Sequence, residues 1–235
     1  MANFVLVHGA WHGGWCWPRV AEPLRRAGHQ VFTPTLTGLG ERAHLLDPQV
    51  NLITHVRDVV GVIEAEELDQ IILCGHSYGG MVITGAADAV RRGRIDSLVY
   101  LDAFVPEPDQ SLIDCLPPER QKRMREHGPG GWMTESPPAS SWKIRAPEDQ
   151  IWVDRRTTPH PAATMSQPLS HRRPWEWVRK SVYVRAEGYD PSPFAPIAER
   201  LKSDPKWEVV GVPCGHDVMV DEPERLVEIL LKAAK

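Results

Sequence analysis

One serine in this 235-residue chain stands in a setting that suits a catalytic nucleophile. Ser77 is the central residue of GHSYG at 75–79, which follows the apolar run IILC at 71–74 and precedes a helical pattern. The pattern G-x-S-x-G between a strand and a helix is typical of a nucleophile elbow, a sharp turn that exposes the serine hydroxyl above a sheet. Glycines suit this turn because a Cβ at either position would collide with the adjoining strand or helix. We therefore predict that Ser77 is the nucleophile of an acyl-transfer reaction.

Such a reaction also needs backbone N–H groups that stabilise the negative charge developing on the attacked carbonyl oxygen. The helix after Ser77 directs its N-terminal N–H groups toward the serine. A second donor is expected from the glycine-rich turn HGAWHGGW at 8–15, which follows the first predicted strand. The predicted oxyanion hole consists of the N–H groups of Ala10 and Tyr78.

A serine hydroxyl needs a general base, and the chain has ten histidines. His216, in VPCGHDVM, follows the last predicted strand. Because all strands of a parallel sheet end at the same edge, we expect His216 and Ser77 on the same side of the molecule. His8 and His12 either line the same rim or, as we prefer, lie behind the site, and His76 is expected to point away by strand alternation. The remaining histidines are interpreted as ordinary surface or insertion residues: His29, His44, His55, His127, His160 and His171.

The elements that must position these residues alternate between two patterns. Short, continuous apolar runs are typical of buried strands, and the segments between them carry apolar residues at helical spacing. This alternation predicts an α/β fold with a mostly parallel sheet covered by helices on both faces. The expected strands are 3–9, 29–36, 70–77, 97–104, 181–188 and 206–215, and the expected helices are 14–28, 54–68, 78–93 and 221–235.

Residues 106–178 break this alternation, with many prolines, five of the nine tryptophans and no clear strand. A structureless loop of that length is unusual in a compact domain. We therefore predict an inserted, mainly helical cap between two parts of one core, 1–105 and 179–235. Its tryptophans either form an aromatic substrate wall or hold the cap on the core. The tryptophans expected to line a substrate pocket are Trp11, Trp152, Trp175 and Trp177.

Together these motifs resemble the α/β-hydrolase superfamily. HGAWHGGWCW at 8–17 and GHSYGGM at 75–81 are most similar to the branch that holds plant methylesterases, hydroxynitrile lyases, and small bacterial ester and carbamate hydrolases, including those of the carbendazim type. The resemblance covers nearly the whole chain and is weak in the cap. It implies an abbreviated sheet that begins at the third strand of the superfamily, and it implies a catalytic histidine at the position of His216.

The carboxylate that would orient this histidine is less obvious. Most relatives place an aspartate after the penultimate strand, where this chain has Tyr189 at the expected position and Asp190 one residue later. One residue of slip in an extended segment reverses the direction of the side chain. The alternative is Asp102, at the end of the fourth predicted strand, where some haloalkane dehalogenases of the superfamily carry their acid. Asp102 is the preferred prediction, Asp190 the second and Glu187 the third.

The resulting expectation is a serine hydrolase that cleaves a small, neutral, aromatic ester or carbamate through a Ser-His-Asp triad and an acyl-enzyme. A hydroxynitrile lyase is the first alternative. Relatives with that activity carry a threonine after the first histidine of the turn and a lysine after the catalytic histidine, whereas this chain has Gly9 and Asp217. A non-catalytic ligand receptor on the same scaffold is the second alternative, against which the intact triad argues.

Composition narrows the class of partner. The formal net charge is −4 without a long run of one sign, so neither nucleic acid nor an anionic membrane is an expected partner. GLGERA at 38–43 matches G-x-G-x-x-A, with Asp58 20 residues beyond Gly38, but Pro48 follows where a dinucleotide site needs a helix. Without HExxH, CxxC or GxxxxGK, no cofactor and no metal are expected.

The N-terminus has no basic leader, and no apolar run approaches the roughly 20 residues that span a bilayer. The four cysteines are scattered without metal-ligand spacing. We interpret the chain as a cytoplasmic protein with reduced thiols, whose expected partner is a small-molecule substrate. The sequence does not indicate an oligomeric state.

Overall fold

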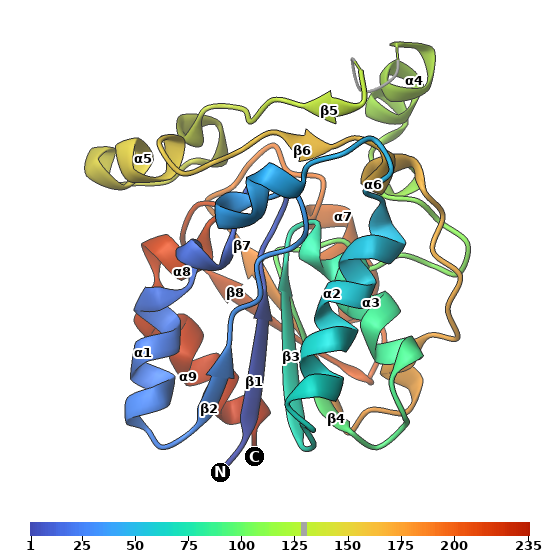
Figure 1. Ribbon diagram of the computed structural model, residues 1–235. Helices are drawn as coiled ribbons and strands as arrows, with labels where there is room; N and C mark the ends of the chain where they lie inside the picture. Colours follow the sequence, from blue (N-terminus) through green and yellow to red (C-terminus); the bar gives the residue numbers. More distant parts are fainter. Residues whose placement is uncertain (128–130) are drawn as a thin grey trace.

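The computed structural model describes residues 1–127 and 131–235, and its centre is one sheet of six parallel strands (Figure 1). Along the sheet the strand order is β2-β1-β3-β4-β7-β8. This confirms the prediction of a mostly parallel sheet. The strands are β1 (Asn3–Val7), β2 (Gln30–Phe32), β3 (Ile71–His76), β4 (Ile95–Leu101), β7 (Lys180–Ala186) and β8 (Trp207–Val212).

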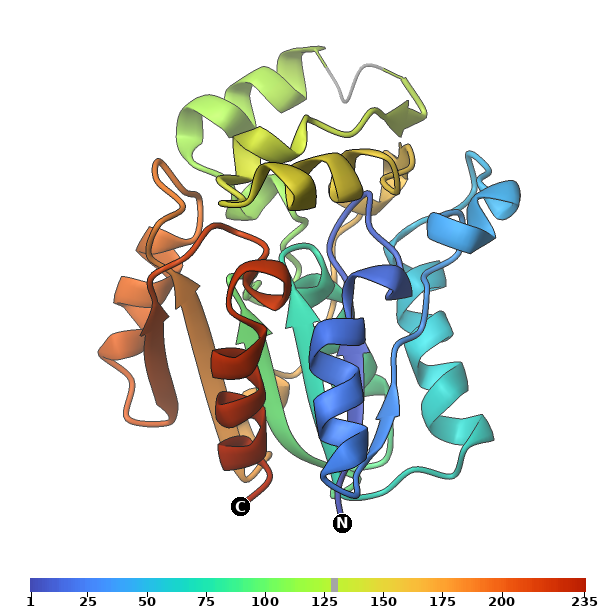
Figure 2. The ribbon, with the colours of Figure 1, turned by 90° about the vertical axis from the view of Figure 1, so that its left-hand side faces the viewer.

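Helices cover both faces of this sheet. Figure 2 shows α1 and α9 side by side on one face, and in Figure 1 the opposite face carries α2 and α3. Each face has its own apolar cluster, and α7 packs with the α2 and α3 side. None of the described helices is both long enough and apolar enough to cross a membrane. The core helices are α1 (Pro18–Arg26), α2 (Leu52–Ala65), α3 (Gly79–Ala89), α7 (Ala195–Lys202), α8 (Val218–Asp221) and α9 (Pro223–Ala233), with the 3₁₀ turns η1 (Gly14–Cys16) and η2 (Gly40–Leu45).

Most of the predicted strands and helices are present, but they begin or end at other residues than predicted. All residues of β3 are buried, as expected for a central strand with both faces covered. The strand expected at 29–36 pairs only as β2, and beyond its end the hydroxyl of Thr35 accepts from the N–H of Gly14. Helix α7 was not predicted, although its apolar Ile197 and Leu201 have helical spacing.

The segment between β4 and β7 lies over the carboxyl ends of the strands (Figures 1 and 2). The prediction was a mainly helical cap; the described part also contains a two-stranded antiparallel sheet. Residues 128–130 of the predicted cap lie outside the described residues. The division at 105/106 and 178/179 stays a prediction. The elements are η3 (Ile113–Cys115), α4 (Pro118–His127), β5 (Met133–Thr134), η4 (Ala139–Trp142), α5 (Pro147–Asp154), β6 (His160–Pro161), α6 (Ala163–Ser166) and η5 (Pro174–Glu176).

Candidate active site

Ser77 stands on a strained turn between β3 and α3. Its φ of 53° lies in the left-handed region that favours glycine. The turn has no space for side chains at its glycines: a Cβ on Gly75 would lie 2.5 Å from the carbonyl oxygen of Gly79, and one on Gly80 would overlap that of Phe104. The N–H of Ser77 donates to Leu101 at 3.1 Å. The neighbouring strand therefore holds the backbone, while Ser77 lines a cavity at the sheet's carboxyl edge.

His216 follows β8 and lines the same cavity. Its Nδ1 lies 2.7 Å from Oδ2 of Asp102, which is fully buried. A carboxylate only accepts hydrogen bonds, so Nδ1 carries the proton and Nε2 is left free to act as a base. The imidazole ring is stacked against Phe194, at a centroid distance of 5.0 Å, and against Tyr189 at 4.8 Å. These contacts restrict rotation of the ring.

Asp102 is held by β7 as well as by its own strand. It follows β4 with a φ of 40°, and its N–H donates to Val184. Its second carboxylate oxygen, Oδ1, accepts from the N–H of Ala186 at 3.1 Å and from Arg185 at 2.8 Å. The side chain of Arg185 is largely buried. Three donors, two on β7 and one on the loop after β8, thus fix both oxygens of this carboxylate.

The two other acids considered from the sequence lie elsewhere. Asp190 is exposed and forms part of the cavity wall, while Glu187 is exposed beside Gly211. Tyr189, at the position where most relatives have the aspartate, contributes its ring to the stack on His216. Asp102 is therefore the one of the three acids that contacts His216.

The glycine-rich turn and the turn at Ser77 each supply a backbone donor to the cavity. Ala10 and Tyr78 both line the cavity, and within the described part of the chain neither N–H has a hydrogen-bond acceptor. The preceding carbonyl, of Gly9, accepts from His8 Nδ1 at 2.8 Å. The other nitrogen of His8 accepts from the N–H of Leu36 at 3.0 Å, which fixes the tautomer. Because a peptide unit is planar and trans, pinning this carbonyl also sets the direction of the Ala10 N–H.

Two more histidines lie beside the turn without lining the cavity. His12 contacts Ala10 and Asp217 and is almost fully buried. His76 is also buried, and its Nε2 donates to the carbonyl of His216 at 3.1 Å. Burial and the neighbouring His216 hold the pKa of His76 well below its usual value. A neutral His76 thus supports the loop that carries His216.

The side chain of Tyr78 ends in a buried network that the sequence interpretation missed. Its hydroxyl lies 2.9 Å from Nδ1 of His55, whose Nε2 donates to Thr37 at 2.8 Å. His160 of β6 packs edge-on against the Tyr78 ring at 4.9 Å. Both histidines are fully buried. The interpretation of His55 as an ordinary surface or cap residue is therefore wrong, whereas His160 lies in the predicted cap but is buried there. A signal existed for His55, which falls on the apolar stripe of α2.

The cavity has a volume of about 790 Å³, and its floor carries Ser77 and His216. Its walls are mostly apolar and partly aromatic. Trp11, with a strained φ of 63°, lines it as expected. So does Trp142, which was not among the predicted pocket residues. Other apolar lining residues include Phe104, Leu112, Leu116, Met165 and Phe194.

The other three predicted pocket tryptophans lie outside this cavity, so that expectation is corrected. Trp152 packs against Trp15 at 5.1 Å, between the cap and the core. The end of the segment between β4 and β7 runs back alongside α3 (Figure 1). This places Trp175 in the core beside Trp207. Trp177 stacks under the guanidinium of Arg92 at 4.0 Å. These side chains hold the segment on the core, which was the alternative reading of the tryptophans.

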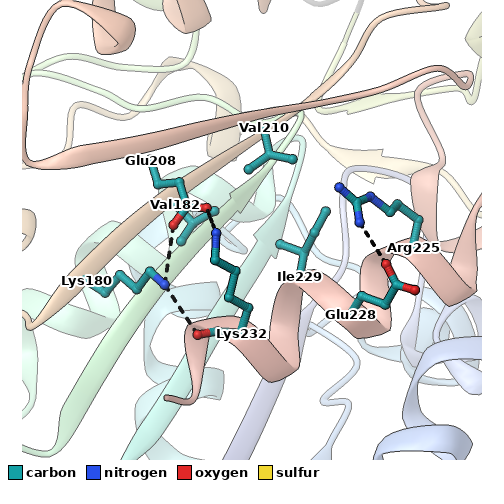
Figure 3. A pocket seen from close by; sticks show the side chains of 8 residues that line it. All are labelled: Lys180, Val182, Glu208, Val210, Arg225, Glu228, Ile229 and Lys232. Atoms are coloured by element: carbon teal, nitrogen blue, oxygen red, sulfur yellow. Dashed lines mark hydrogen bonds and ion pairs between the residues drawn. The ribbon is translucent and has the colours of Figure 1, made fainter.

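A second, smaller pocket lies between α9 and the strands β7 and β8 (Figure 3). Its charged side chains pair with one another: Glu208 contacts both Lys180 and Lys232, and Arg225 contacts Glu228 at 2.7 Å. It contains none of the residues of the predicted triad. The chemistry of this chain therefore concentrates at the carboxyl edge of the sheet.

A parallel sheet with a strained serine after β3 and a histidine–carboxylate pair at the same edge defines the α/β-hydrolase class. Residues 4–229 match the model of the alpha/beta hydrolase family. The chain belongs to this family, and the expectation of a hydrolytic enzyme is confirmed.

Several known proteins are similar to this chain in sequence or structure. The chain is 50% identical over 240 residues to the carbendazim hydrolyzing esterase of Nocardioides sp. (strain SG-4G), with 98% of each chain covered. It is 33% identical over 126 residues to methyl jasmonate esterase 1 of Vitis vinifera, covering 52% of this chain and 46% of the relative. Among solved structures, an extracellular alpha/beta-hydrolase from a Paenibacillus species superposes with a TM-score of 0.85 at 25% identity, covering 99% of both chains.

Proposed function

We propose that this protein hydrolyses a small aromatic ester or carbamate through an acyl-enzyme formed on Ser77. The observation that carries this proposal is the contact between His216 Nδ1 and Asp102, at 2.7 Å, on a cavity that Ser77 also lines. That arrangement leaves Nε2 as the base on the cavity side. It is the arrangement of groups that acyl transfer requires.

In the proposed cycle, Nε2 of His216 takes the proton of Ser77 while the serine Oγ attacks the carbonyl carbon. Asp102 stabilises the imidazolium, and the N–H groups of Ala10 and Tyr78 bind the oxyanion. The imidazolium then protonates the departing alcohol or amine. Water attacks the acyl-serine with His216 again as the base, and the acid product leaves with Ser77 restored.

The aromatic and carbamate parts of the proposal rest on two further observations. The cavity wall carries Trp11, Trp142 and Phe104, which suit a flat apolar group. The relative that is 50% identical over nearly its whole length is named for hydrolysis of carbendazim. Two exposed arginines, Arg120 and Arg123, also line the cavity, and their charged groups suit polar substituents on the substrate.

The test is a substrate panel of methyl carbamates of aromatic heterocycles, aryl acetates, aromatic methyl esters and lactones, read by product release. A fluorophosphonate label should block turnover and attach to Ser77. Labelling of Ser77 without turnover of any compound would favour a receptor. Cyanide release from mandelonitrile would favour a lyase, although a Cβ at Gly9, where lyases carry threonine, would lie 3.0 Å from the Cβ of Ser77.

A further inference from the structure

A buried pair of opposite charges joins the two loops that meet at the candidate active site. Nε2 of His12 lies 3.0 Å from Oδ2 of Asp217, and the exposed fractions of the two side chains are 2% and 0%. His12 is two residues after Ala10 in the glycine-rich turn, and Asp217 directly follows His216. The pair therefore connects the candidate oxyanion donor to the candidate base across 205 residues of sequence.

Both ring nitrogens of His12 face acceptors. Nε2 faces the carboxylate, and Nδ1 lies 2.8 Å from the carbonyl oxygen of Ala10. A neutral imidazole has a single N–H, so the ring can satisfy both contacts only as an imidazolium. Burial alone would lower the pKa of His12, but Asp217 raises it above its usual value. Burial alone would raise the pKa of Asp217, but His12 lowers it to about 2.

Aromatic side chains surround this imidazolium. Trp15 stacks on the ring at a centroid distance of 5.1 Å, and Trp142 packs at the same distance from another side. His76, His216 and Cys16 are further titratable groups near Asp217, and Nε2 of His76 lies 3.7 Å from its second oxygen. That nitrogen donates to the carbonyl of His216, so His12 is the principal partner of the carboxylate.

A buried ion pair contributes little net stability compared with well-packed apolar residues, because both ions lose their hydration. The placement of this one has a more specific consequence. The bond from His12 holds the carbonyl of Ala10, while His8 holds the carbonyl of Gly9. His8 thereby anchors the peptide unit that contains the Ala10 N–H, and His12 anchors the next one, so the backbone cannot rotate on either side of the Ala10 α-carbon.

We propose that His12 is a positioning residue of the oxyanion hole, which together with His8 keeps the Ala10 N–H in place and is itself oriented by Asp217. The inference rests on the proposed acyl-transfer function. Loss of the His12 side chain should mainly destabilise the transition state, because a misdirected donor weakens binding of the developing oxyanion more than binding of the neutral substrate.

The test compares two double variants in the same neutral background. His12→Leu/Asp217→Asn removes the donor to Ala10 without leaving an unpaired buried carboxylate. His12→Asn/Asp217→Asn is its matched control, because the Asn amide nitrogen can occupy the place of Nδ1 and donate to Ala10. The Leu variant should lose kcat on the order of 10-fold to 100-fold with KM changed little, and the Asn variant should recover most of it.

Inhibition by a trifluoromethyl ketone, which forms a tetrahedral adduct on serine, should weaken in the Leu variant by a factor similar to the loss of kcat. Arg19→Met, which breaks the ion pair between α1 and Asp149 of α5, serves as a control for general loosening and should keep kcat. Equal kcat in the two double variants, or a rise in KM alone, would overturn the proposal.

A spectroscopic measurement on the wild-type protein needs no turnover. In wild-type protein labelled with ¹⁵N-histidine, the resonances of His12 at neutral pH should show both nitrogens protonated, and Asp217→Asn should return the ring to one proton. A neutral His12 with a bare Nδ1 in the wild type would overturn the inference even if the enzyme hydrolyses esters. Failure of every substrate, with His12 doubly protonated, would instead count against the proposed function.

Discussion

Asp102 contacts His216 from the end of β4, with 2.7 Å between Oδ2 and Nδ1. Two further donors from β7, the N–H of Ala186 and the guanidinium of Arg185, hold the other oxygen. The carboxylate therefore reaches the imidazole from the strand next to the one that carries Ser77. The loop after β7, where most relatives of this superfamily carry the acid, forms cavity wall instead.

Asp102→Asn should reduce kcat far more than Asp190→Asn. An amide at 102 can present N–H to Nδ1 and so favour the wrong tautomer of His216, for which a loss on the order of 10⁴ is the reference from serine proteases. Asp190 is exposed, so its amide variant should stay within about 3-fold of wild type. Steady-state kinetics on one aryl ester decide between them. The reverse ranking would refute the assignment of Asp102.

Ser77→Ala should lower kcat by on the order of 10⁶, and His216→Ala should do so to a similar extent. The hydroxyl is the attacking group in the proposed cycle, and alanine has no group that could replace it. Activity should be measured with enzyme purified on fresh resin, to exclude carry-over of wild type. Turnover by Ser77→Ala close to the wild-type rate would end the acyl-enzyme mechanism.

Trp142→Ala should raise KM for an aromatic substrate, lowering kcat/KM roughly 10-fold, which corresponds to about 1.4 kcal/mol of lost contact. Trp142 lines the cavity, and the carbonyl that receives the N–H of His216 belongs to its backbone and survives the substitution. Trp152→Ala is the matched control, since Trp152 packs on Trp15 and Arg19 outside the cavity. It should lower thermal stability and leave KM unchanged. Equal effects on KM would contradict this separation.

Gly80→Ala should destabilise the fold by about 3 kcal/mol or more, because the new Cβ would overlap the carbonyl oxygen of Phe104 in the rigid elbow. Gly61→Ala offers the opposite case within α2: its Cβ would meet no atom within 4 Å, so a gain of about 0.5–1 kcal/mol is expected. Denaturant unfolding of both variants measures the difference. A Gly80→Ala protein as stable as wild type would show that the elbow can relax.

Stability should fall when the pH is lowered from 6.5 toward 5. Burial lowers the pKa of His8 to about 3 and of His55 to about 4, whereas an unfolded histidine binds its proton near 6.5. In this window the unfolded chain binds more protons than the folded one, so the free energy of unfolding rises with pH and is lost on acidification.

His55→Gln should reduce this slope by about one proton, on the order of 1.4 kcal/mol per pH unit, as measured by denaturant unfolding at several pH values. The glutamine amide can replace the donor to Thr37, so the variant should fold. Identical slopes for variant and wild type would mean that His55 takes up no proton on unfolding.

The parts of the site that the sequence predicts are those encoded locally. The run into Gly75 specifies a buried strand, and the residues around Ser77 admit only a sharp turn, so β3 and its elbow were predictable from eleven consecutive letters, IILCGHSYGGM. His216 followed from the rule that parallel strands end at one edge. The choice between Asp102 and Asp190 depends on a φ of 40° and on donors from β7, and neither is visible in the local pattern.

The other parts of the site depend on the three-dimensional path of the chain, which the spacing of apolar residues does not indicate. The segment between β4 and β7 has short elements and no regular repeat, so which of its tryptophans reaches the cavity depends on how the chain returns to β7. Trp142 does so through a 3₁₀ turn, while Trp175 returns to the core. The pairing of His12 with Asp217 joins positions 205 residues apart, and no local pattern in the sequence indicates it.

Because Asp102 at the end of β4 supplies the carboxylate, the stretch 187–194 does not need to supply an acid to hold His216. That stretch still presents Tyr189, Asp190, Pro191, Pro193 and Phe194 to the cavity. A library that varies the two exposed residues, Asp190 and Pro191, and keeps Pro193 and the two stacking rings would therefore explore new substrate shapes while the proton-transfer residues keep their supports.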